Sequence, residues 1–382
     1  MMNDLKLSAS TFAGLEQVLS EELLQLGAKN IKIGHRNVQF EGDLGFLYKA
    51  NYNLHTALRV FLQLKEFKFI KTGEQLYRAI SKIDWNQIFG NDKSFRIDVS
   101  GKSEAFRNTQ FIALKAKDAL VDQFRKNTGK RPDVNIKNPD IRIRLHFDAW
   151  RMQVLLDSSG ESLHKRGYRS ATNLAPINEV LAAGIVKISG WQAQNNFLDP
   201  MCGSGTLPIE AAMLAMNIPA SINREKFAFM NWKNFDSDLW KIIKKSSFNK
   251  IKDLPTGIKI SGYDKAPSAV EKSIQNIKNA GLEDFIKIKQ ADFFKTIKPE
   301  QPVTLIFNPP YNERLTIDVQ HFYKKIGDTL KHHYPDTIAW ILMQKDALKW
   351  IGLRPSKKIP LYNGKIEVRM AKFEMYSGRK WT

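Results

Sequence analysis

Residues 303–315 read VTLIFNPPYNERL, and this stretch decides how the C-terminal half of the chain is interpreted. Its first five residues have the apolar composition of a buried strand. The strand runs directly into Asn308-Pro309-Pro310-Tyr311, and neither proline can donate a hydrogen bond to a neighbouring strand. The strand must therefore stop at its carboxyl end on an amide, two rigid residues and an aromatic ring.

The sequence around this stretch alternates short apolar strands with helices, such as APSAVEKSIQNIKNAG and VQHFYKKIGDTLKHHY. This alternation predicts βαβ units and a parallel, doubly wound sheet. The last part, KKIPLYNGKIEVRMAKFEMY, predicts an antiparallel hairpin with Asn363-Gly364 at its turn. The aromatic-rich residues 218–257 are expected to form an insertion that covers one face. The expected strands of the sheet are NNFLDP, IKISGYD, FIKIKQAD, VTLIFNPP and TIAWILMQ.

The N-terminal part has a different order of elements. LKLSAS (5–10) is strand-like, the helical pattern GLEQVLSEELLQLG ends at Gly27, and two short extended pieces follow. From Phe95 the chain reads strand, helix, strand, strand. Residues 159–176 are rich in Ser, Gly and basic side chains, which predicts a linker to the C-terminal sheet.

Charge is the first indication of a partner. The chain has 382 residues, enough for two or three domains, and its 59 Lys and Arg against 39 Asp and Glu give a formal charge of +20. Such a chain attracts polyanions, nucleic acid above all, although a basic surface that only aids solubility is the alternative. With one cysteine, no run of about 18 apolar residues and no signal-like N-terminus, we expect a cytoplasmic protein.

The first strand of the C-terminal sheet leads into DPMCGSGT, residues 199–206. Ligands of open parallel sheets bind beyond the carboxyl ends of the strands, and glycines let the backbone approach them closely. The loop has only G-x-G and begins with an acidic residue, which suits a cation better than a pyrophosphate. We expect S-adenosylmethionine here. The residues of this loop that we expect at the cofactor are Asp199, Gly203 and Gly205.

The next two strands also end in acidic residues. Asp264 follows the second strand and is placed to accept hydrogen bonds from ribose hydroxyls, and Asp292 follows the third and is placed to hold an adenine amino group. Each aspartate alone could instead be a helix cap. Three in succession, with a glycine-rich turn after the first, favour a cofactor site, and Asn308 is expected to border it.

The residues after the fourth strand suit methyl transfer to the exocyclic amine of a base. The nitrogen lone pair of such an amine is delocalised into the ring, so two acceptors aimed at its N–H groups would localise it. The Asn308 side-chain oxygen and the Pro309 carbonyl are the expected acceptors, and Pro309 and Pro310 keep the backbone rigid. Tyr311 offers a face on which the base stacks. The alternative is an ordinary strand followed by a proline-rich turn.

Two further kinds of site are not expected. Cys202 has no histidine close in sequence, so we interpret it as a small loop residue and not as a nucleophile. His332 and His333 lack partners at metal-ligand spacing, so we expect no metal.

The combination of DPMCGSGT and NPPY resembles class I S-adenosylmethionine-dependent methyltransferases that modify exocyclic amino groups. LDSSGESLHKRGYR (156–169) followed by APINEVLAAGI (175–185) resembles the junction between a THUMP RNA-binding domain and the methyltransferase in one branch of that class. NPPYNERL and GLEQVLSEELLQLGA also resemble this RlmL-like branch, whose members make N2-methylguanosine in large-subunit (23S) ribosomal RNA. The resemblance extends over nearly the whole chain. By position it implies catalysis by Asn308, Pro309, Pro310 and Tyr311. The cofactor contacts that it implies are Asp199, Pro200, Cys202, Gly203, Ser204, Gly205, Thr206, Asp264, Asp292 and Asn308.

The resemblance implies a fold class and an order of domains. It implies an α/β, Rossmann-like catalytic domain (177–382) after a ferredoxin-like module (1–62), a THUMP domain (63–158) and a linker (159–176). Some relatives continue into a second methyltransferase, which we expect this chain, ending at Thr382, to lack. Asn312 replaces a glycine of the family loop, and Asn178 stands where relatives often carry a basic residue.

Four functions stay open at this point. The leading one is guanine-N2 methylation of large-subunit ribosomal RNA or of a pre-ribosomal particle. Transfer RNA is an alternative substrate, and the NPPY chemistry also fits an adenine-N6 DNA methyltransferase. A ribosome-assembly protein that binds RNA without needing catalysis is the fourth. No membrane partner is expected.

Overall fold

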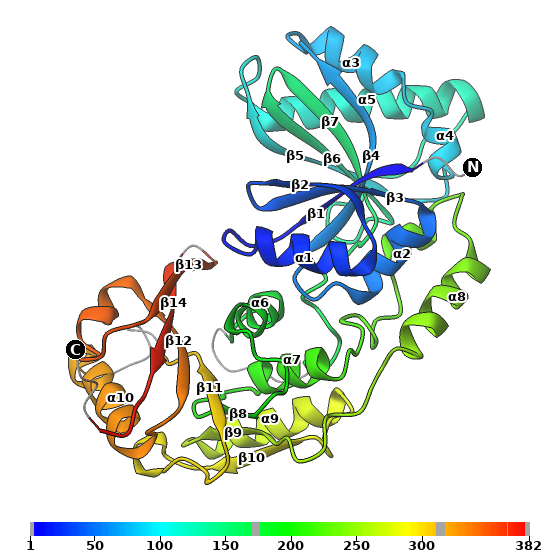
Figure 1. The fold of residues 1–382 in the computed structure, drawn as a ribbon. Helices are drawn as coiled ribbons and strands as arrows, with labels where there is room; N and C mark the ends of the chain where they lie inside the picture. Colours follow the sequence, from blue (N-terminus) through cyan, green and yellow to red (C-terminus); the bar gives the residue numbers. More distant parts are fainter. Residues whose placement is uncertain (1–3, 170–175, 311–317, 365, 379–382) are drawn as a thin grey trace.

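The structure is a computed structural model that describes residues 4–169, 176–310, 318–364 and 366–378 (Figure 1). It contains two seven-stranded sheets, one in each half of the chain. The N-terminal sheet has the strand order β2-β3-β1-β4-β7-β6-β5. Its elements are β1 (Leu5–Ser10), α1 (Glu16–Leu26), β2 (Lys29–Gly34), β3 (Asn37–Gly42), α2 (Leu44–Asn53), β4 (Arg59–Lys68), α3 (Gly73–Ser81), α4 (Trp85–Ile88), β5 (Phe95–Ser103), α5 (Thr109–Thr128), β6 (Ile141–Ala149) and β7 (Arg151–Asp157).

Strand β4 joins the first two modules into one N-terminal domain. It pairs with β1 on one side and with β7 on the other, so it runs across the expected boundary at residues 62 and 63. The buried side chains of both modules belong to a single apolar cluster that includes Leu7, Leu47, Ile112 and Leu145. The helices α1, α2 and α5 therefore all contribute to one core on the apolar side of a shared sheet.

The second sheet confirms the predicted parallel, doubly wound arrangement. Its order is β10-β9-β8-β11-β12-β14-β13, in which neighbours from β10 to β12 are parallel and β14 is antiparallel to both of its neighbours. Asn363 pairs with Ile366 in the predicted hairpin. The elements are α6 (Glu179–Ser189), β8 (Asn196–Asp199), α7 (Thr206–Ala215), β9 (Ile260–Asp264), α9 (Pro267–Asn279), β10 (Ile286–Gln290), η2 (Phe293–Lys295), β11 (Val303–Phe307), α10 (Val319–His333), β12 (Ile338–Gln344), η4 (Lys345–Lys349), β13 (Lys357–Asn363) and β14 (Ile366–Glu374).

Each face of this sheet has its own apolar core. Residues of α6, α7 and α9 pack with Phe197, Ile306 and Leu342 on one face. Residues of α10 pack with Leu305 and Ile341 on the other. The strand order reverses between β8 and β11, which is where a doubly wound sheet opens a crevice at the carboxyl ends of its strands.

The insertion between α7 and β9 does not follow the prediction that it covers one face of its own sheet. It contains η1 (Ala228–Asn231) and α8 (Ser237–Phe248), and α8 lies against α2 of the N-terminal domain (Figure 1). Its aromatic side chains, Phe227, Phe229, Trp232 and Trp240, belong to the N-terminal core. The C-terminal half of the chain thus completes the core of the N-terminal half.

A side chain of the N-terminal half also enters the C-terminal core. This is Leu15, which directly precedes α1. Leu15 is fully buried in the core formed by α6 and α7. A Cβ atom at Gly184 of α6 would lie 2.6 Å from the Leu15 methyl carbons, so the helix backbone approaches this leucine closely. Each domain therefore contributes apolar side chains to the core of the other.

The expected linker contains a buried polar network up to Arg169. The Arg166 guanidinium is 2 % exposed and donates to the carbonyls of Leu163 and His55 and to the carboxylate of Glu210. Tyr168 donates its hydroxyl proton to the same carboxylate at 3.0 Å. Burial disfavours the ionised form of Glu210, but Arg166 and His55 outweigh this and lower its pKa. The segment is thus fixed to both domains.

Candidate active site

The loop after β8 is held by hydrogen bonds from the neighbouring strand and helix. The Cys202 N–H donates to the Tyr263 carbonyl (2.8 Å), and the Gly203 N–H donates to Asp264 Oδ2 (3.0 Å). On the α9 side, the Asn276 side chain donates to the Ser204 carbonyl (3.0 Å). These contacts fix the loop before any ligand binds.

Both glycines of the loop adopt the left-handed conformation that favours glycine. Gly203 has a φ of 54° and Gly205 a φ of 78°. A Cβ atom at Gly205 would lie 3.0 Å from the Ser273 Cβ of α9, so this turn leaves little room for a side chain. The loop then enters α7, whose first residue is Thr206.

The three strand-end aspartates bind nearby backbone N–H groups and follow neighbouring parallel strands at one edge of the sheet. Asp199, Asp264 and Asp292 each accept a hydrogen bond from the N–H two residues later. Asp264 also reaches the loop after β8, and its carbonyl accepts the Ala291 N–H of the third strand end at 3.0 Å. The helix-cap alternative therefore holds only for Asp292, which is the N-cap of η2, since the N-caps of α7 and α9 are Gly205 and Ala266.

The chemistry of this set fits a cationic cofactor with a ribose. Asp199 is 2 % exposed, and burial, with a smaller effect of Asp264, raises the pKa of its carboxyl group well above the usual value. A positively charged group beside Asp199 would stabilise the ionised form. Asp264 carries two carboxylate oxygens at the opening between β8 and β9, the place at which ribose hydroxyls are bound in such sheets.

Cys202 lies inside this loop and is 7 % exposed. Burial raises the pKa of its thiol well above the usual value, and the carboxylates of Asp199 and Asp264 add to the effect. A Cβ atom at Gly262 of β9 would lie 3.1 Å from the Cys202 sulfur. The thiol is therefore protonated and packed, as expected of a small loop residue.

Strand β11 places Asn308, Pro309 and Pro310 beside the cofactor loop. All five residues of β11 are buried, and β11 pairs in parallel with β8 through Leu305 and Leu198. Asn308 and Pro310 are half-buried and Pro309 is buried directly after the strand. Tyr311 and Asn312 lie outside the described residues. The structure thus brings Asn308, Pro309 and Pro310 to the same sheet edge as Asp199 and Pro200.

Sequence reasoning missed Arg169, the last described residue before position 176. Its guanidinium donates to the Thr206 hydroxyl (2.8 Å) and to the Ile177 carbonyl (3.0 Å), and Glu179 Oε1 lies 3.2 Å from its Nε. Arg169 therefore connects the junction between the domains to the end of the cofactor loop. The signal was present in the motif HKRGYR, but its basic residues suggested a solvated linker.

Asn178 forms the N-cap of α6, where its side chain accepts the Val180 N–H at 3.0 Å. This gives the asparagine a local structural role at the start of α6.

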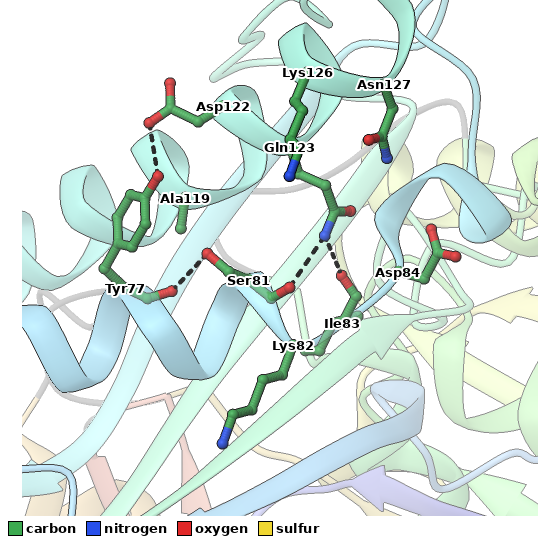
Figure 2. A pocket seen from close by; sticks show the side chains of 10 residues that line it. All are labelled: Tyr77, Ser81, Lys82, Ile83, Asp84, Ala119, Asp122, Gln123, Lys126 and Asn127. Carbon is green, nitrogen blue, oxygen red and sulfur yellow. Dashed lines mark hydrogen bonds between the residues drawn. The ribbon is translucent and has the colours of Figure 1, made fainter.

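A separate cavity of about 530 Å³ lies between α3 and α5 in the N-terminal domain (Figure 2). Gln123 of α5 donates to the carbonyls of Ser81 and Ile83, and the Tyr77 hydroxyl donates to Asp122 (Figure 2). These polar groups are used in joining the two helices, so the cavity is a feature of helix packing.

None of the helices in the described ranges is both long and apolar enough to cross a membrane. In the same part of the chain, no three His, Cys, Asp or Glu side chains are grouped in a way that could hold a metal ion. His333 instead bonds through Nδ1 to the Thr296 carbonyl at 3.0 Å.

The strand order, the glycine-rich loop after the first strand and the acidic strand ends together define a Rossmann-like class I methyltransferase domain. Comparison with known families agrees. Residues 166–372 match the family described as "RMKL-like, methyltransferase domain", residues 71–157 match the THUMP domain and residues 6–61 match the RlmL ferredoxin-like domain. The chain belongs to the RMKL-like methyltransferase family, in the THUMP-containing, RlmL-like branch.

Curated relatives are similar in sequence over most of this chain. It is 40 % identical over 368 residues to the ribosomal RNA large subunit methyltransferase K/L of Psychromonas ingrahamii, covering 94 % of this chain and 48 % of that protein. It is 36 % identical over 378 residues to the protein of the same name from Methylococcus capsulatus, with 97 % and 51 % covered. The chain spans about half the length of the curated relatives it matches.

Solved structures share the fold along the whole chain. A protein assigned as a methyltransferase and crystallised with SAH superposes with a TM-score of 0.87 and 31 % identity, with 100 % of both chains covered. A protein of Listeria monocytogenes described as a predicted N6-adenine-specific DNA methylase gives a TM-score of 0.87 at 28 % identity, with 99 % and 97 % covered. TrmN of Thermus thermophilus (TM-score 0.74, 18 % identity, 97 % and 99 % covered) shares the fold.

Proposed function

We propose that this protein transfers a methyl group from S-adenosylmethionine to the exocyclic N2 of a guanine in large-subunit ribosomal RNA. The observation that carries the proposal is the position of Asn308 and Pro309 at the end of β11, beside a preorganised loop that begins at Asp199. We also propose that the protein works in the cytoplasm, where its RNA is assembled into ribosomes.

The support for the cofactor is the acidic edge of the sheet. S-adenosylmethionine would supply an electrophilic methyl group. Asp199 would hold its ammonium group, Asp264 its ribose and Asp292 its adenine amino group, while Cys202 and the residues from Gly203 to Thr206 would line its path. A relative of similar fold was crystallised with SAH, which agrees with this assignment.

The support for an exocyclic amine is the pair of acceptors at the end of β11. The Asn308 side-chain oxygen and the Pro309 carbonyl would accept the two N–H groups of the amine and localise its lone pair. The prolines hold the backbone carbonyl in place, so orientation would supply most of the rate enhancement. Tyr311 would stack on the base, which must first leave its helix.

The support for RNA is the THUMP domain together with the relatives' names. The chain matches the THUMP domain over residues 71–157, and the curated relatives are named ribosomal RNA methyltransferases. The name of the Listeria protein points to adenine N6 of DNA instead. Transfer RNA is the second candidate, because a THUMP domain indicates RNA without identifying which RNA is bound.

We further propose that the ferredoxin-like module spans residues 1–62, the THUMP domain 63–158, the linker 159–176 and the catalytic domain 177–382. The first two modules share one sheet through β4.

Nucleoside mass spectrometry tests the proposal directly. Ribosomal and transfer RNA from a deletion strain are treated with the purified protein and S-adenosylmethionine. We expect new N2-methylguanosine in large-subunit rRNA. N2-methylguanosine in tRNA would contradict the choice of RNA, and methylation of DNA adenine alone would contradict the choice of base.

Asn308→Ala is the matched variant for this experiment. We expect product formation to fall at least about 100-fold, because one preorganised acceptor is lost. Binding of S-adenosylmethionine, measured by calorimetry, should change less than about threefold, which is under 1 kcal/mol. Loss of both methyl transfer and cofactor binding would show that Asn308 is needed for the structure of the site.

A further inference from the structure

Five lysines from separate parts of the chain line a cleft between the two domains. It has a volume of about 720 Å³ and lies between α1 and α2 on one side and the ends of α6 and α7 on the other. Lys49 comes from α2, Lys187 from α6 and Lys357 from the start of β13, and Lys250 and Lys252 follow α8. We call these five residues and their surroundings the lysine cleft.

The two acidic residues of the lysine cleft do not neutralise it. Five lysines against two glutamates, Glu21 and Glu22, leave a formal charge of +3. The Glu22 carboxylate is buried and already accepts the N–H groups of His55 and Thr56 and the Thr56 hydroxyl. Lys187 forms an ion pair with Glu22, with 3.8 Å between Nζ and Oε1, and among the described residues the other four lysines have no ion pair.

Two of the lysines, Lys49 and Lys250, lie close enough to repel each other. Lys49 donates to the Leu26 carbonyl at 2.6 Å, and burial, together with repulsion from Lys250, lowers its pKa. A negatively charged group between the two ammonium groups would offset both effects. Apolar side chains such as Ile188 and Ile359 also line the cleft, and they strengthen electrostatic attraction by excluding water.

The lysine cleft lies away from the candidate active site. Helix α7 begins at Thr206, at the cofactor loop, and its last residue, Ala215, lines the cleft. At 1.5 Å per residue the helix separates the two places by about 15 Å. A ligand of the cleft would therefore not touch the cofactor loop.

We propose that the lysine cleft binds a stretch of the sugar–phosphate backbone of the substrate RNA, remote from the methylated base. The proposal rests on the proposed function for the identity of the polyanion. Lysines on several elements along one cleft suit successive phosphates better than a single one, and lysine acts as a point charge toward phosphate without base preference. The cleft would anchor the RNA while the base reaches the opposite edge of the sheet.

The test removes three exposed lysines whose side chains have no ion pair among the described residues. The triple variant Lys250→Gln, Lys252→Gln, Lys357→Gln is compared with the wild type for binding of protein-free large-subunit rRNA over a range of salt. We expect affinity to fall about tenfold or more, and the slope of log affinity against log salt to become shallower by about 2, because each lost phosphate contact removes about 0.7–0.9. Binding of S-adenosylmethionine should be unchanged.

A control variant has the same change in charge on other surfaces. Lys278→Gln, Lys289→Gln and Lys331→Gln replace three exposed lysines on α9, β10 and α10. An equal loss of affinity in this control would overturn the proposal, since net charge alone would then explain it. An unchanged salt slope in the cleft variant would overturn it as well. Because the measurement is binding, it does not depend on which base is methylated.

Discussion

Arg169 shows how a single side chain connects the junction between the domains to the cofactor loop. Its planar guanidinium bonds to the Thr206 hydroxyl and the Ile177 carbonyl while facing the Glu179 carboxylate, which is 3 % exposed. Burial raises the pKa of Glu179, and the neighbouring Arg169 counteracts this. The arginine therefore holds the start of α6 and the start of α7 in a fixed relation.

Arg169→Lys tests this positioning role. A lysine keeps the charge, but its single nitrogen cannot bond to Thr206 and Ile177 as Nη2 does while a second nitrogen, Nε in arginine, lies beside Glu179. We expect the dissociation constant for S-adenosylmethionine to rise about tenfold, which corresponds to the loss of one charge-assisted hydrogen bond of about 1.5 kcal/mol. Calorimetric titration measures it.

Arg169→Met combined with Glu179→Gln is the control, because it removes the buried charge along with its partner. We expect the double variant to unfold at a higher temperature than Arg169→Met alone, since an unpaired buried carboxylate is costly. Wild-type cofactor affinity in Arg169→Lys would contradict the positioning role.

The residues of the candidate site could be predicted where they follow a strand, and not where they come from a distant segment. The positions of Asp264 and Asn308 could be predicted because the end of a parallel strand is readable from the sequence and all such ends lie at one edge. Their roles in binding and catalysis stay predictions. Arg169 was not found, because its contacts with Thr206 depend on how the domain junction folds back. Basic residues near glycine and serine have the same composition in a packed junction and in a solvated linker.

At the scale of the elements, the sequence did not predict which domain the insertion containing α8 packs against. Hydrophobic periodicity predicted the strands β8 to β12 and the helices α9 and α10, because each pattern is local. The core into which Phe229 and Trp240 pack is not determined by the sequence nearby. Trp240 packs edge-to-face on Tyr52 of α2, with ring centroids 5.4 Å apart. Nothing in the spacing of these aromatic residues distinguishes one apolar core from another.

Trp240→Ala tests the contribution of this element. The indole is 5 % exposed and contacts the rings of Tyr48, Tyr52, Phe227 and Phe229. We expect the free energy of unfolding to fall by about 3–5 kcal/mol, as for other buried tryptophans cut to alanine. Denaturant titration measures it. Trp150→Ala, at a 39 % exposed site, should cost far less; equal effects would show that α8 adds no specific stability.

At the scale of the whole molecule, the two domains share their cores. Phe229 and Trp240 enter the N-terminal core, Leu15 enters the C-terminal core, and Arg166 and Glu210 form a buried pair next to the junction. Chains of this size usually unfold in more than one step, because their domains are only loosely coupled. Here each domain buries apolar side chains in the core of the other. We therefore expect the N-terminal domain to stay at a fixed distance from the candidate active site of the C-terminal domain.

Differential scanning calorimetry should therefore show one cooperative transition for the wild type. Leu15 and Leu19 allow a matched comparison, because both are fully buried leucines four residues apart, one in the C-terminal core and one in the N-terminal core. Leu19→Ala should lower the transition temperature and keep a single transition, since it weakens the N-terminal core and leaves the junction intact. Leu15→Ala removes a contact between domains at a cost of about 2–5 kcal/mol and should split the transition in two. Two transitions in the wild type, or identical behaviour of the two variants, would contradict the coupling.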